Sequence, residues 1–124
     1  MKILIVFYSR YGNTAKLAEG IAEGVRQVEG AEVIMRKVRE TAPPQVIARD
    51  EKWQNAPDEM AQKYPEATLA VLEEADAIIF GSPTRYGNVS AELKLFLDTT
   101  SPFWVQGKLI DKVAEVTQRL LKGR

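Results

Sequence analysis

The sequence predicts an α/β fold with a parallel sheet. An apolar run at 3–7 is followed by a polar loop, an amphipathic helix and a second strand at 32–38. A strand, a helix and a strand within roughly 35 residues form a βαβ unit, which crosses over right-handed into a parallel sheet. A further apolar run at 75–80 is followed by a second polar loop. The expected architecture is therefore a three-layer sandwich with helices on both faces of the sheet.

The helices are predicted from apolar spacing. The first is expected from about Thr14 to Val28, because Leu17, Ile21 and Val25 recur at helical steps beside small alanines. Shorter helices are expected at 68–74 and at 92–98. The last of these places Leu93, Phe96 and Leu97 on one face.

Residues 39–66 interrupt this rhythm. The segment holds four prolines and many charges, and it is too long for a simple connection. We expect an irregular excursion from a single domain at 1–124. Its large side chains Trp53, Met60 and Tyr64 either pin the excursion to the body or line a pocket, and the first interpretation is favoured.

Composition narrows the possible chemistry. The chain of 124 residues is 45% hydrophobic and carries 17 basic and 17 acidic residues, so its formal charge is zero and predicts no nucleic-acid partner. Without cysteine or histidine, it lacks thiolates and the commonest metal ligand and general base. We expect no metal site, and any catalysis must rest on a cofactor, on carboxylates, or on lysine and tyrosine.

Targeting signals are not apparent in the sequence. The N-terminus enters a strand almost at once, without a signal-peptide pattern. No apolar stretch reaches the length of a membrane span. We therefore expect a cytoplasmic protein.

The polar loop after the first strand is the strongest functional signal. The N–H groups at the start of the following helix favour an anion, and glycine lets the backbone approach it. The loop lacks the Gly-Lys-Ser/Thr ending of a triphosphate site and the three glycines of a dinucleotide site. A terminal monophosphate and a helix cap without ligand both remain open. The loop residues are Ser9, Arg10, Tyr11, Gly12, Asn13 and Thr14.

A second polar loop follows the strand at 75–80. Strands one and three are neighbours at the switch point of a doubly wound sheet, so the two loops would flank one crevice. That crevice would suit a planar heterocycle that carries a phosphate, and Tyr86 would offer it a flat face. The loop contributes Pro83, Thr84, Arg85, Tyr86, Gly87 and Asn88.

Together these features resemble the flavodoxin-like WrbA family of FMN-dependent NAD(P)H:quinone oxidoreductases. The resemblance covers about residues 1–112 and includes both loops, the helix end at 96–98, and Trp104 before Gly107-Lys108. It implies strand order 2-1-3-4-5, with the FMN phosphate held by residues 9–14 and the isoalloxazine ring lying along residues 83–88. It also implies that Trp104 lies near the flavin. Members are similar in forming dimers and tetramers whose neighbouring subunits help shape each site.

The chain departs from the family after residue 108. A helix from Asp111 with an apolar stripe at Val113, Val116, Leu120 and Leu121 is preferred to a strand over 113–117, because Lys112 and Glu115 do not suit a buried parallel strand. The expected fold is then C-terminally shortened, with strand order 2-1-3 and further strands missing or supplied by a partner. The third strand would be an exposed edge that could pair with its copy in a homodimer or higher homo-oligomer.

Two functions follow from these expectations. The first is an FMN-binding oxidoreductase that passes electrons from NAD(P)H through FMN to a quinone, with no catalytic residue assigned, because the flavin carries the chemistry. The alternative is a truncated or engineered flavodoxin-like scaffold. It would be oligomeric and would bind FMN weakly or not at all, without catalysis.

Overall fold

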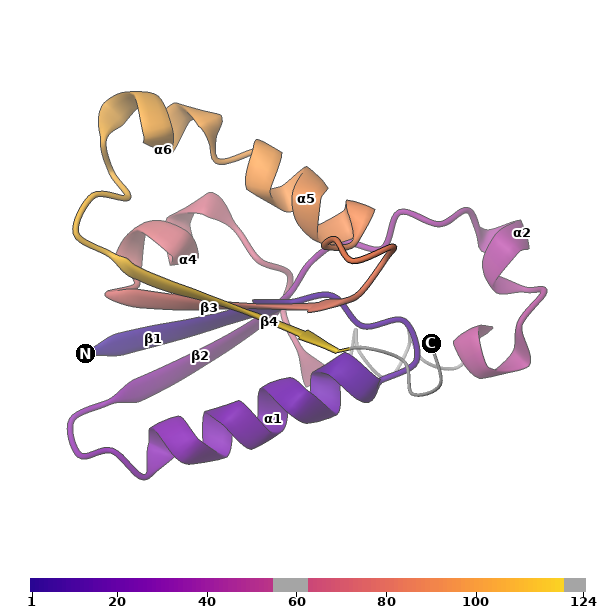
Figure 1. Ribbon diagram of the computed structural model, residues 1–124, viewed down its shortest axis with the longest axis horizontal. Coiled ribbons are helices and arrows are strands. Elements are labelled where there is room, and N and C mark those ends of the chain that lie inside the picture. The colour runs from indigo at the N-terminus through magenta and orange to yellow at the C-terminus, as the bar shows by residue number, and fades with distance from the viewer. Residues whose placement is uncertain (55–62, 120–124) are drawn as a thin grey trace.

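The computed structural model describes residues 1–54 and 63–119 and contains a parallel sheet in the order β2-β1-β3-β4 (Figure 1). The strands are β1 (Lys2–Phe7), β2 (Glu32–Lys37), β3 (Ala77–Pro83) and β4 (Val113–Arg119). In the register, Ile5 of β1 lies opposite Met35 of β2 and Ile79 of β3. All carboxyl ends therefore meet at one edge of the sheet.

Helices cover both faces of this sheet. Figure 1 shows α1 (Asn13–Arg26) on one face and α4 (Leu69–Glu74), α5 (Ala91–Asp98) and α6 (Ser101–Gln106) on the other. A short helix, α2 (Pro44–Ile47), lies beyond the carboxyl ends of the strands. This arrangement confirms the predicted three-layer α/β class. None of the helices in the described residues is long and apolar enough to cross a membrane.

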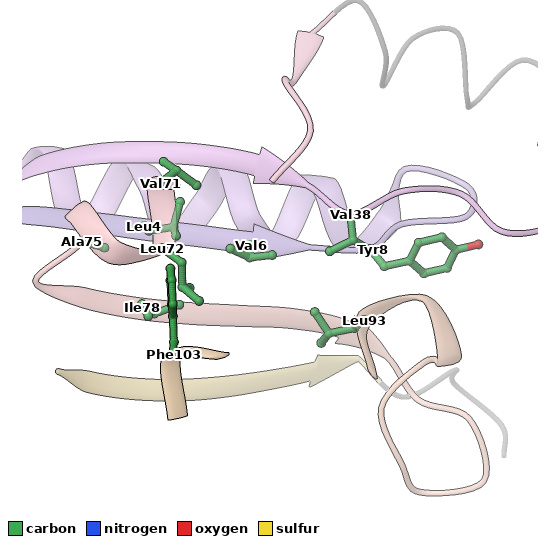
Figure 2. Packing of buried hydrophobic residues seen from close by; sticks show 10 residues of the cluster. All are labelled: Leu4, Val6, Tyr8, Val38, Val71, Leu72, Ala75, Ile78, Leu93 and Phe103. Carbon is green, nitrogen blue, oxygen red and sulfur yellow. The ribbon is translucent and has the colours of Figure 1, made fainter. Parts of the chain in front are cut away.

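The central strand β1 is buried on both faces, which explains its continuous apolar sequence. Leu4 and Val6 join the cluster beneath α4, α5 and α6, shown in Figure 2. Ile5 and Phe7 join a second cluster beneath α1. Leu93 of α5 is fully buried in the first cluster, as its predicted helix face requires.

Helix α1 packs on the sheet through small residues. Its buried side chains are Thr14, Ala15, Ala18 and Ala22, while the larger predicted stripe lies partly exposed beside them. The helix ends at Arg26, two residues before the predicted end at Val28. Short side chains let α1 approach β1 and β3 closely, which brings its N-terminus near the strand ends.

The predicted C-terminal helix is wrong, because residues 113–119 form strand β4 in parallel register with β3. Glu115 argued against a strand buried on both faces, but residues 113–116 are exposed and Glu115 reaches solvent. Lys112 precedes the strand, and its ammonium donates to the carbonyls of Glu73 and Ala75 at the end of α4. Asp111 has a left-handed φ of 68° and so forms a turn instead of a helix cap.

This strand corrects the predicted sheet order. The described order is 2-1-3-4, not 2-1-3, and β3 is paired on both sides. Pairing between the third strands of two copies is therefore wrong as a dimer hypothesis. Val113 and Val116 of β4 are 71% and 52% exposed, so apolar surface lies at this side of the sheet instead.

The excursion at 39–66 is tied to the body at both of its described ends. Lys37 N–H donates to the Pro65 carbonyl, and Ala67 N–H donates to the Lys37 carbonyl, so the chain returns beside β2. Tyr64 is buried with its ring edge-on to Phe7 at 5.0 Å, and its hydroxyl donates to Glu19 Oε1 at 2.5 Å. Tyr64 therefore pins the excursion to the body, as expected, whereas Met60 lies outside the described residues.

Candidate functional site

The first loop leaves the N-terminus of α1 open. Gly12 has a φ of 93°, which residues with a Cβ rarely adopt, and its N–H donates to Ser9 Oγ at 3.0 Å. No side chain in the described residues caps α1. The N–H groups of the first helical turn therefore have no partner within the helix and remain available to an anion.

Two loop hydroxyls lie against the sheet. Ser9 and Thr14 are 9% and 3% exposed. A Cβ added to Gly81, two residues before the end of β3, would lie 3.5 Å from Thr14 Cγ2 and 3.1 Å from Phe7 Cβ. Gly81, which sequence reasoning did not single out, therefore allows β3 to approach this loop. Its only sequence signal is a small residue at a strand end.

Arg10 and Tyr11 turn toward the excursion. The guanidinium carbon of Arg10 lies 4.2 Å from the ring centroid of Trp53, a cation–π contact, and Trp53 is 5% exposed. The Tyr11 hydroxyl donates to Asp50 Oδ2 at 2.6 Å. This hydrogen bond raises the pKa of Tyr11 and lowers the pKa of the Asp50 carboxyl. Trp53 thus pins the excursion to the candidate site itself.

The second loop is a tight hairpin after β3. Arg85 and Asn88 exchange both backbone hydrogen bonds, at 2.9 and 3.0 Å. The two residues between them have positive φ, 54° for Tyr86 and 76° for Gly87, as in a type I′ turn. This turn leaves the Tyr86 side chain fully exposed, where a ligand could lie against it.

Buried serines hold the second loop in place. Ser82, fully buried, accepts a hydrogen bond from Ser90 N–H at 2.8 Å and donates to the Pro83 carbonyl. Ser90 Oγ in turn caps α5 by accepting from Leu93 N–H. The loop is therefore anchored at both ends. Ser82 was not predicted to matter, because its partner lies eight residues away.

An open cleft of about 520 Å³ joins the two loops. Arg10 comes from the first loop, and Arg85 and Asn88 come from the second. The remaining lining residues are Val89, Ala91, Glu92 and Lys94. Three of the predicted site residues therefore line one cleft, whereas Asn13 and Thr14 at the N-terminus of α1 are not among its lining residues.

Each loop also keeps one buried polar atom without a partner. Among the described residues, nothing accepts a hydrogen bond from Arg10 Nε or pairs with Thr84 Oγ1. Buried polar groups are nearly always hydrogen-bonded. These two atoms and the open helix N-terminus fit a ligand that carries a phosphate and further polar groups, as FMN does.

Trp104 is not brought to these loops. Its side chain is 82% exposed on α6. The preceding residue of the same helix, Phe103, packs beside Ile78 near the start of β3 (Figure 2). Lys108 Nζ, just after α6, lies 3.1 Å from Glu73 Oε1 at the end of α4. Both contacts place α6 at the amino ends of the strands, whereas the two loops lie at the carboxyl ends.

The sheet order and the paired loops define a flavodoxin-like α/β protein with a candidate anion site at its switch point. Residues 1–118 match the family model of NADPH-dependent FMN reductase, and the chain belongs to this family. The family resemblance seen in the sequence is thereby confirmed.

Relatives and solved structures agree with this assignment. The chain is 46% identical over 116 residues to an NAD(P)H dehydrogenase (quinone) from Geobacter sulfurreducens, and 45% identical to one from Geotalea uraniireducens. Both matches cover 94% of this chain but 56% of the relative, so the chain spans little more than half of their length.

The fold is also similar to that of solved flavoproteins. The comparison with the crystal structure of the flavodoxin, WrbA-like protein from Agrobacterium tumefaciens gives a TM-score of 0.66 at 27% identity. The match covers 98% of this chain and 62% of the Agrobacterium tumefaciens chain. A flavoprotein in complex with FMN from Lactobacillus acidophilus has a TM-score of 0.51 at 20% identity, over 94% of this chain and 92% of that one. The second likeness supports the fold alone.

Proposed function

We propose that this chain binds FMN at the carboxyl edge of its sheet and acts as an NAD(P)H:quinone oxidoreductase-type flavoprotein. The observation that carries the proposal is the open N-terminus of α1, which faces the same edge as the second loop. Residues 9–14 would hold the phosphate, and residues 83–88 would lie along the ring system. Family membership and the names of the relatives support this assignment.

The chemistry divides between cofactor and protein. Bound FMN would accept hydride from NAD(P)H and pass electrons to a quinone, which fits a chain without histidine or cysteine. The protein would bind the phosphate, orient the ring beside Tyr86 and leave one side open to substrates. We propose a cytoplasmic location together with this activity, since NAD(P)H is available there.

Titration with FMN, followed by quenching of flavin fluorescence, tests the site. Ser9→Ala and Thr14→Ala should each weaken FMN binding by about 1–3 kcal/mol, the cost of a lost hydrogen bond to a charged group. Thr99→Ala, at the far end of α5, is the matched control and should leave the affinity unchanged. Unchanged affinity in both loop variants would place the phosphate elsewhere.

A second candidate is FMN binding without turnover. It requires only the two loops, both of which lie within residues 1–118 that the family model matches. Oxidation of NADH and NADPH in the presence of FMN and a soluble quinone separates the two candidates. Turnover above the free-FMN rate supports the oxidoreductase, while tight binding without turnover supports the second candidate.

We further propose that the chain assembles as a homo-oligomer in which Trp104 serves a neighbouring copy. The seven-residue strand β3 separates α6 from the loops by about 20 Å, further than a tryptophan side chain reaches. Trp104→Ala should alter the flavin spectrum only where the protein is oligomeric. A monomeric mass at micromolar concentration, measured by sedimentation, would contradict the assembly.

A further inference from the structure

The carboxylate of Glu40 joins the excursion to the first loop. The Tyr8 hydroxyl lies 3.0 Å from both oxygens of Glu40, and Trp53 Nε1 donates to Oε1 at 3.0 Å. The backbone N–H of Thr41 donates to Oε2 at 3.0 Å. The Glu40 side chain thus accepts hydrogen bonds from the residue that follows β1, from the excursion and from its own turn.

Both aromatic partners of Glu40 adjoin residues of the first loop. Tyr8 directly precedes Ser9 and is 3% exposed; Figure 2 shows its hydroxyl pointing away from the core beyond the end of β1. Trp53 supports the guanidinium of Arg10 through the 4.2 Å cation–π contact. The positions of Ser9 and Arg10 therefore depend on two rings that share one acceptor.

The environment of Tyr8 shows how tightly this contact is built. Burial raises the pKa of the Tyr8 hydroxyl, and the nearby charge of Glu40 raises it further. Tyr8 therefore stays a hydrogen-bond donor to Glu40 throughout the range in which the protein would work. Three donors within about 3 Å stabilise the carboxylate locally, as expected for a partly buried charge.

We propose that Glu40 is a positioning residue of the FMN site, which fixes Arg10 through Trp53 and the start of the first loop through Tyr8. The inference rests on the proposed FMN binding. Simple electrostatics predicts the opposite effect, because removing a negative charge near a phosphate site should strengthen binding of the anion. A loss of FMN affinity on removal of Glu40 is therefore specific to positioning.

The test compares FMN with riboflavin, which has the same ring system but no phosphate. Glu40→Ala should weaken FMN binding about tenfold and riboflavin binding by less than about twofold, because the affected side chains serve the phosphate. Glu29→Ala removes an exposed carboxylate at the amino edge of the sheet and should change neither affinity. Glu40→Gln keeps one acceptor oxygen and should fall between Glu40→Ala and the unmodified chain.

The double variant of Glu40→Ala and Arg10→Ala tests whether Glu40 acts on FMN binding through Arg10. If Glu40 acts through Arg10, Glu40→Ala should cost less than about threefold in the Arg10→Ala background, since coupled residues are not additive. A full tenfold loss in that background would overturn the route. Equal losses for FMN and riboflavin, or unchanged or tighter FMN binding, would overturn the positioning role.

The unmodified chain distinguishes this inference from the proposed function. If it does not bind FMN, both fail. If it binds FMN and Glu40→Ala binds equally well, only the positioning role fails. Should Glu40→Ala not fold, Glu40→Gln carries the test: a loss for FMN that is absent for riboflavin supports the role, and unchanged affinity overturns it.

Discussion

Replacement of Gly81 by alanine should destabilise the fold through one close contact. A Cβ at this position would lie 3.1 Å from Phe7 Cβ, whereas carbon atoms in ordinary contact lie about 3.5–4.0 Å apart. Phe7 is fully buried, so it can yield only by shifting β1 or the cluster beneath α1. The same Cβ would make an ordinary contact, at 3.5 Å, with Thr14.

Two opposing effects determine how much Gly81→Ala changes the free energy of unfolding. Inserting a methyl group into a well-packed core costs about 1–3 kcal/mol, and replacing glycine returns about 0.4–1 kcal/mol by restricting the unfolded chain. A net loss of about 1–2 kcal/mol in the free energy of unfolding is expected. Because the strain falls on Phe7 instead of Thr14, the FMN affinity should change by less than about threefold.

Urea denaturation of Gly81→Ala, with Gly20→Ala as the matched control, measures this cost. Gly20 lies exposed within α1, and a Cβ there would meet nothing within 4 Å. Gly20→Ala should therefore stabilise the protein by up to about 1 kcal/mol through helix propensity. Stabilisation by both replacements would refute the close-packing argument at the end of β3.

Three further predictions concern the second loop, the core and the loss of stability at acid pH. Tyr86→Ala should perturb the flavin absorption spectrum but change the melting temperature little, because the ring is exposed; a large loss of stability without a spectral change would reverse that assignment. Leu93→Ala removes a fully buried side chain and should cost about 2–5 kcal/mol in urea denaturation, and a loss below about 1 kcal/mol would contradict its role in the core. The Tyr64 hydroxyl lowers the pKa of Glu19 below its usual 4.5, so the stability that this carboxylate contributes is present above that pH and is lost as pH falls through the lowered pKa. Glu19→Gln should therefore flatten the fall in urea midpoint between pH 5 and pH 3, and an unchanged slope would contradict the contribution.

Local patterns were sufficient to predict most of the sheet. The sequence of β1 predicts a strand, because a strand that is buried on both faces is continuously apolar. The sequence of α1 predicts a helix, because its apolar residues recur at helical spacing. The βαβ order then determines the parallel pairing. For this reason the first three strands, and the edge that carries both loops, were predicted from the sequence.

The segment at 113–119 shows where local pattern is insufficient. Val113 and Val116 are three residues apart, which fits a helix face, yet both occupy β4. What decides the outcome is the free side of β3, which offers seven residues of parallel pairing from Ala77 to Pro83. Exposure of residues 113–116 also removes the penalty that Glu115 would meet in a central strand.

For the candidate site too, one part could be predicted from local sequence and another part could not. Each βα junction of a parallel sheet offers N–H groups at a helix start, so the backbone part of the anion site follows from the sequence of the loop and its neighbours. Its side chains depend on contacts across longer distances: Tyr8 meets Glu40 at a separation of 32 residues, and Tyr11 meets Asp50 at 39. A chain with the same loop but different residues at 40, 50 and 53 would keep the helix N-terminus and lose the arrangement of Arg10 and Tyr11. Similarity of the loop therefore argues for a phosphate site, whereas we expect the affinity of that site to depend on residues of the excursion.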